Sequence, residues 1–143
     1  MVSLSRLQQA WEPRVLSILR IVVGLLILQY DMQKIFNFPP HFHLRAFHLF
    51  TVVPGLVGII ELVGGILIVL GLFTRPVAFL LFGDMVFVYF ISHAPRGFFS
   101  IVIGGNDSKL AILYCLIFLY LSLVGAGGWS LDQRRAPAAR GRA

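Results

Sequence analysis

Four long runs of apolar residues divide the chain, and shorter, more polar segments separate them. A helix needs roughly 20 apolar residues to cross the 30 Å hydrocarbon core of a bilayer. Runs near this length predict four membrane-spanning helices, over residues 15–35, 52–73, 77–93 and 110–124. They form one membrane domain, residues 15–131, between a polar segment, 1–14, and a basic tail, 132–143, which we expect to be disordered. The pattern predicts an all-α fold, an integral membrane antiparallel four-helix bundle.

Composition agrees with a membrane location. The 143 residues are 58% hydrophobic and only 13% charged, and the mean hydropathy is +0.87, far above that of a soluble domain. The net charge of +6 would suggest a nucleic-acid partner in a soluble protein. Here the basic residues lie at the ends of the apolar runs, so we attribute them to orientation in the lipid bilayer and expect no nucleic-acid binding.

The basic residues are unequally divided between the two sides of the predicted bundle. Four spans place both termini on one side, with eight basic residues: Arg6, Arg14, Arg20, Arg75, Arg134, Arg135, Arg140 and Arg142. Four lie on the other side: Lys34, Arg45, Arg96 and Lys109. Because basic residues accumulate on the cytoplasmic side, we expect both termini in the cytoplasm.

Glu61 interrupts the second apolar run close to its middle. An acidic side chain at that depth costs about 2.5 to 3.5 kcal/mol to insert, so it must be paired, protonated or turned to a cavity. Small residues that let another helix approach closely share its helix face: Gly58, Gly64 and Gly65. The pattern predicts an inward-facing Glu61. Two roles stay open: a protonated carboxyl that only bridges helices by hydrogen bonds, and a carboxyl that transfers protons.

The third run contains a second acid, Asp84. Thr74, Arg75 and Pro76 predict a tight turn, which makes the third helix antiparallel to the second. Counted from this turn, Glu61 and Asp84 lie about 20 Å and 12 Å along their helices. The bulky side chains on the face of Asp84 are expected to fill the groove left by the glycines: Leu80, Leu81, Phe87, Val88 and Ile91.

The first run is charged along one face. At 100° per residue, one sector of about 80° contains several residues that we expect to point into the protein: Arg20, Gly24, Ile27, Asp31 and Lys34. Asp31 and Lys34, three residues apart, can pair with each other. For Arg20 two interpretations stay open, a side chain that extends to the nearer interface and one that pairs with an inward carboxylate.

Residues with metal-binding or redox chemistry are few. Three histidines follow the first run, His41, His43 and His48, and His93 ends the third, but their spacing matches no specific metal signature. We interpret them as interfacial side chains and predict no metal site, although metal or haem ligation stays open. The one cysteine, Cys115, excludes an intramolecular disulfide and a cysteine-bound iron–sulfur cluster.

Three blocks of sequence form recognisable motifs. The longest follows the pattern E-L-V-G-G-x-L-x-x-x-G-L-F-T-R over Glu61–Arg75, and the others are G-D-M at Gly83–Met85 and W-S-L-D at Trp129–Asp132. Together they resemble the DoxX family of small bacterial membrane proteins. At the end of the first span the family pattern usually reads Q-H-G-x-Q-K. This chain has Tyr30 and Asp31 in place of the histidine and glycine.

The resemblance implies a four-helix protein of the bacterial inner membrane. Some members of the family are linked to thiosulfate:quinone oxidoreduction and others to membrane-associated redox-stress complexes. The resemblance leads us to expect an oxidoreductase subunit that uses a quinone. Such a subunit could bind a redox partner protein, and it could form a homo-oligomer. The site residues follow from the cost of charge in an apolar run and not from the resemblance: Glu61 and Asp84 would donate protons, and Arg20, Asp31 or Lys34 would bind substrate or stabilise its charge.

Two other classes of function stay open. The first is a non-enzymatic assembly or scaffold protein, which the lack of any cofactor motif in the sequence favours. The second is a proton-coupled carrier of a small molecule, which paired membrane acids would suit. With four spans, a carrier would have to oligomerise to line a pathway.

Overall fold

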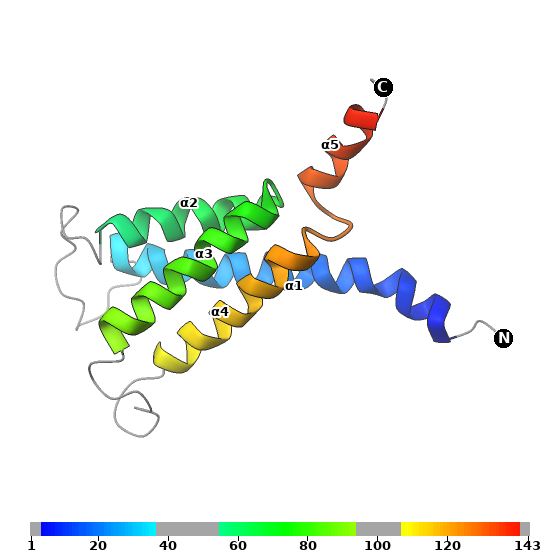
Figure 1. The fold of residues 1–143 in the computed structure, drawn as a ribbon. Coiled ribbons are helices and arrows are strands. Elements are labelled where there is room, and N and C mark those ends of the chain that lie inside the picture. The colour runs from blue at the N-terminus through cyan, green and yellow to red at the C-terminus, as the bar shows by residue number, and fades with distance from the viewer. Residues whose placement is uncertain (1–3, 37–54, 94–106, 141–143) are drawn as a thin grey trace.

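The computed structural model describes residues 4–36, 55–93 and 107–140, which are mostly helical (Figure 1). The helices are α1 (Leu4–Phe36), α2 (Val57–Leu70), α3 (Thr74–Val88), α4 (Asp107–Val124) and α5 (Leu131–Arg140). A π-helical turn, η2 (Tyr89–His93), continues α3. No strand occurs in these described ranges, so the all-α prediction is confirmed for them.

Two of the helices are long and apolar enough to cross a membrane. They cover Gln8–Met32 in α1 and Thr74–Ile91 in α3 and η2. The other two predicted spans correspond to shorter apolar helices, Val57–Leu70 and Lys109–Val124.

A glycine ends α2 earlier than the sequence pattern predicts. Gly71 has φ +67°, a left-handed conformation that glycine adopts without steric cost. Its N–H donates to the Ile68 carbonyl (3.1 Å) and the Leu72 N–H to the Leu67 carbonyl (3.0 Å), the two bonds of a Schellman motif. The connection to α3 is therefore Gly71–Phe73. The prediction of a turn at Thr74–Pro76 is wrong, because proline is tolerated in the first turn of a helix.

Both ends of the chain are more helical than the sequence pattern predicts. The first helix begins at Leu4, within the segment expected to precede the first span. The tail is helical over Leu131–Arg140 instead of disordered. Ser130 explains this start, since its Oγ accepts a hydrogen bond from the Gln133 N–H (3.2 Å), as a helix-capping serine does.

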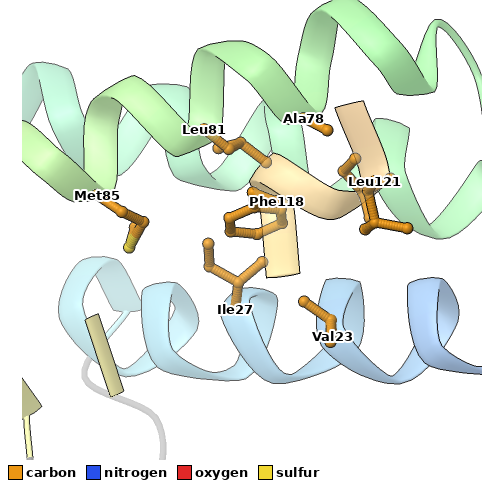
Figure 2. Close-up of a cluster of buried hydrophobic side chains, with 8 residues drawn as sticks. Val23, Ile27, Ala78, Leu81, Met85, Phe118 and Leu121 are labelled. Carbon is orange, nitrogen blue, oxygen red and sulfur yellow. The ribbon is translucent and has the colours of Figure 1, made fainter. Parts of the chain in front are cut away.

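The first four helices surround one apolar core. Neighbouring contacts join α1 to α2, α2 to α3 and α3 to α4. Side chains from all four helices form the buried cluster: Val23, Ile27, Ile68, Ala78, Leu81, Met85, Phe118 and Leu121. Figure 2 shows the Phe118 ring between Leu81 of α3 and Ile27 of α1. We call the end with the Gly71–Phe73 turn, beyond which α1 and α5 project, the terminal end (Figure 1), and the opposite end the loop end.

Glycines of α2 allow the neighbouring helices to approach closely. A Cβ atom built on Gly64 would lie 2.8 Å from Leu81 Cδ2, and one built on Gly65 would lie 2.9 Å from Ile27 Cγ2. Gly24 of α1 is equally restricted, because its Cβ would lie 2.7 Å from Val69 Cγ2. The glycine face predicted from the sequence therefore packs against α3 on one side and α1 on the other.

Substituting valine for Gly64 should destabilise the helix packing. Leu81 is completely buried and cannot move into open space, so overpacking should lower the free energy of unfolding by about 1 to 3 kcal/mol. Thermal unfolding in mild detergent measures this. Gly83→Ala is the control, because nothing lies within 4 Å of a Cβ at Gly83 and alanine favours the helix. Equal losses in the two variants would contradict the packing argument.

Candidate functional site

The contacts between α1 and α2 place Asp31 and Glu61 at the same level. The neighbours of Gly24 are Ile68 and Val69, and those of Gly65 are Ile27 and Leu28, so the two helices are antiparallel. Four residues along α1 from Ile27 lead to Asp31, and four residues back along α2 from Gly65 lead to Glu61. Residues four apart share a helix face. The two acids therefore follow the same contact line, one turn closer to the loop end.

The contact between α2 and α3 adds Asp84 to this level. Gly64 packs on Leu81, and the helices are antiparallel across the short turn. Three residues back from Gly64 lead to Glu61, and three residues on from Leu81 lead to Asp84. Tyr114 of α4 completes the level, because it lies close enough to Asp31 to interact electrostatically. We call Asp31, Glu61 and Asp84 the acid layer.

Glu61 and Asp84 lie at the same level, so the different depths inferred for them from the sequence are wrong. Glu61 lies nine residues before the end of α2 and Asp84 ten residues after the start of α3, about 14 Å and 15 Å. The inferred values of 20 Å and 12 Å differed because the turn was placed three residues too late. Glu61 is four residues from the start of α2, so it lies on the loop-end side of the middle of this helix.

The three carboxyl groups are shielded from solvent to different degrees. Asp31 is 0% exposed and Glu61 is 2% exposed, whereas Asp84 is half-buried. Burial disfavours a charged carboxylate unless a cation or hydrogen-bond donors compensate. All three groups engage other groups of the chain. Such an arrangement can hold protons or bridge helices.

An apolar zone separates the acid layer from the terminal end. Val23 and Ile27 of α1, with Ala78 and Leu81 of α3, belong to the buried cluster that fills this zone (Figure 2). Buried water needs two to four polar partners, which aliphatic side chains do not provide. Along α2, Glu61 lies four residues from the loop-end start of the helix and nine residues from its terminal end.

We predicted that the bulky side chains on the helix face of Asp84 fill the groove beside the glycines of α2, and this prediction is only partly right. Leu81 is buried against Gly64, as predicted. Leu80, Phe87 and Ile91 are instead exposed, so they do not fill the groove. The reason is that α3 uses one face for α2 and another for α4, which leaves these three side chains turned outward.

Arg20 has a different environment from either alternative that the sequence left open. Its side chain is completely buried (0% exposed), so it does not extend to an interface. One guanidinium nitrogen donates to the carbonyls of Ile68 (2.6 Å) and Val69 (2.9 Å), and the other donates to the Trp129 carbonyl (2.5 Å). Arg20 therefore binds the C-terminal end of α2, where helix carbonyls lack partners and a cation is favoured.

Asp132 supports the same region from α5. Its two carboxylate oxygens accept hydrogen bonds of 2.8 Å each, from the backbone N–H groups of Phe73 and Thr74. Its own N–H donates to the Gly71 carbonyl (2.9 Å), and Arg20 is within electrostatic reach. A carboxylate at a helix N-terminus is stabilising. We call Arg20, Gly71 and Asp132, with the Trp129 carbonyl, the terminal clamp.

Alanine at Asp132 should weaken this clamp. It would remove the cap of α3, which is worth about 0.5 to 2 kcal/mol in other proteins. We expect a loss near the upper end of this range in the free energy of unfolding, because a charge near Arg20 also disappears. Denaturant titration in mild detergent measures it. The exposed neighbour Gln133 is the control, and an equal loss in Gln133→Ala would contradict the capping role.

The remaining predicted residues have simpler placements. Gly58 is buried in α2. The side chain of Lys34, the side chain of His93 and the loop with His41, His43 and His48 lie outside the described residues, as does the predicted Asp31–Lys34 pair. Among the described residues no group of His, Cys, Asp or Glu could hold a metal ion.

Comparison with known proteins agrees with the motifs. The DoxX family model matches residues 15–94, more than half of the chain. The chain belongs to the DoxX family. An uncharacterized protein of Haemophilus influenzae is 39% identical over 129 residues, covering 88% of this chain and 94% of the relative. An uncharacterized membrane protein of Mycobacterium tuberculosis is 34% identical over 143 residues, covering 90% and 86%. No solved structure matches.

The structure gives physical roles to the sequence blocks that suggested DoxX. Within Glu61–Arg75, Glu61 belongs to the acid layer, the paired glycines make the helix contacts, and Gly71 ends α2. Trp129 and Asp132, from the W-S-L-D block, belong to the terminal clamp. The sequence pattern did not predict this second role, although Ser130 and Gln133 form a recognisable S-x-x-Q helix start.

Proposed function

We propose that this DoxX protein is a membrane subunit of a quinone-linked redox system, in which Glu61 and Asp84 supply protons. The observation that carries the proposal is the acid layer, since helix contacts bring carboxyl groups of three helices to one level in an apolar interior. Carboxyl groups can accept and donate protons, so a set of them in an apolar interior is suited to proton transfer.

The proposal includes a multi-pass topology in a bacterial inner membrane, with four spans and both termini cytoplasmic. Large apolar side chains exposed on all four helices support it, among them Leu25, Val63, Phe79, Leu116 and Leu123. Lipid would cover these side chains. The excess of arginine at the terminal end supports the orientation.

The open side of α3 fits a lipid-soluble quinone. Asp84 is half-buried, and a Cβ on the preceding Gly83 would meet nothing within 4 Å. The exposed side chains of Leu80 and Phe87 lie about one helix turn on either side of Asp84. An apolar ring approaching through the bilayer could therefore reach this carboxyl group, whereas Glu61 lies deeper.

A bound quinone would supply two-electron, two-proton chemistry. The electrons would come from a reduced sulfur compound such as thiosulfate, or from the reduced centre of a partner protein. Asp84 would give up one proton at its carboxyl oxygen, and Glu61 would deliver the next. Both carboxylates would then regain protons from water at the loop end, which returns the site to its starting state.

Mass spectrometry of the gently purified protein would test this function. We expect a quinone and a redox partner protein to co-purify, and vesicles with the protein to reduce added quinone. A constant partner with no quinone and no turnover would contradict the proposal.

A scaffold function is the second candidate. The acids engage other groups of the chain, and the terminal clamp joins three separate segments, as a purely structural protein would require. A proton-coupled carrier is a third class, which uptake into liposomes driven by a pH gradient would support.

A further inference from the structure

A groove lies beside the N-terminal half of α1, apart from the acid layer. Its volume is about 550 Å³, within the range of small-molecule sites. Leu16 and Leu19 line the groove and also pack against the buried core. Val15 of α1 and Tyr120 of α4 add to this apolar part.

The groove changes from polar to apolar along α1. Toward the N-terminus it is lined by Gln8, Gln9, Trp11 and Glu12. Glu12 and Leu19 are seven residues apart, about 10 Å along the helix. One leaflet of a bilayer has about 15 Å of hydrocarbon, half of the 30 Å core. The groove therefore covers about two-thirds of the hydrocarbon depth of one leaflet. Its polarity matches one lipid that lies beside the helix, with its head group toward the terminal end.

A charged side chain at the polar part distinguishes between lipid head groups. Among the residues that the structure describes, Glu12 is the charged residue that lines the groove, and it is exposed. A carboxylate complements a head group that carries an ammonium, because the ammonium can donate hydrogen bonds to it.

We propose that this groove binds an aminophospholipid, the class represented by phosphatidylethanolamine. The ammonium group donates hydrogen bonds to the Glu12 carboxylate. The proximal acyl chain lies along Val15, Leu16 and Leu19, and the exposed Trp11 ring lies at the head-group level, where tryptophan is enriched. This proposal is independent of the redox function.

Native mass spectrometry of the full chain, delipidated in detergent, tests the proposal. The probes are phosphatidylethanolamine, phosphatidylcholine and phosphatidylglycerol with identical acyl chains. Phosphatidylcholine lacks ammonium hydrogens, and phosphatidylglycerol lacks the ammonium group. Since exposed charge pairs are weak, we expect the ethanolamine lipid to bind about 2- to 5-fold more tightly than either.

Glu12→Gln should remove this preference without changing the fold, because the side chain is exposed and its size is kept. Asp107→Asn, at the first residue of α4 and so at the loop end, is the matched control that removes one negative charge elsewhere. It should keep the preference. Equal binding of the three lipids to the natural chain, tighter binding of phosphatidylglycerol, or a preference that survives in Glu12→Gln would each overturn the proposal.

Discussion

Replacing Glu61 with glutamine is expected to lower quinone-dependent turnover by about 100-fold or more, because a positioned proton donor contributes about 10²- to 10⁴-fold to rate. Glutamine keeps the size of the side chain and its capacity for hydrogen bonds but has no proton to transfer. The 2% exposure of Glu61 means that bulk water cannot easily replace it. Absorbance of a short-chain quinone in vesicles with equal amounts of protein measures the rate.

Two further variants show whether the acid layer acts as a unit. Asp84→Asn should lower turnover similarly, since Asp84 lies on the open side of α3 and would meet the quinone first. The double variant should then cost little more than either single one, because groups that act in series are not additive. Asp107→Asn is the control outside the layer. Unchanged turnover in both single variants would eliminate the proton-donor role and favour the scaffold.

Arg20→Ala is expected to lower the free energy of unfolding by about 3 kcal/mol or more, because each buried carbonyl left without a donor costs about 1 to 3 kcal/mol. Three backbone carbonyls, those of Ile68, Val69 and Trp129, would lose their donor. Unfolding can be followed through Cys115, the single cysteine, which is half-buried. Its reaction with a maleimide dye reports opening of the helices.

Two arginine variants separate the loss of charge from the loss of geometry. Arg20→Lys keeps the charge but lacks the planar fork that donates in three directions, so most of the stability should still be lost. Arg14→Ala removes an exposed arginine from the same helix and should change stability by less than about 1 kcal/mol. If Arg20→Ala unfolds like Arg14→Ala, the clamp is not a stabilising element.

Local pattern predicts the features that depend on one helix. Arg20, Gly24, Ile27 and Asp31 are buried along one face of α1, as their helical spacing indicates. The glycines beside Glu61 face inward for the same reason. The carboxyl groups could be recognised individually because charge is costly in an apolar run, without any knowledge of neighbouring helices.

Features that join distant segments could not be predicted in this way. Arg20 binds carbonyls 48 and 109 residues away, and backbone carbonyls carry no sequence signal. The common level of the three acids depends on the register of two helix pairs, which close contacts at Gly24, Gly64 and Gly65 determine. A three-residue error in the predicted position of the turn between α2 and α3 was enough to give Glu61 and Asp84 different inferred depths.

The position of Asp132 has a consequence for biosynthesis. The N-terminal end of α3 receives its cap, and Arg20 its third carbonyl, from residues near the end of the chain. A ribosome adds about 5 to 20 residues per second, so several seconds pass between the synthesis of the α2–α3 hairpin and that of these partners. A stop codon shortly after Val124 would leave every apolar helix intact and yet produce a chain that cannot complete its own assembly.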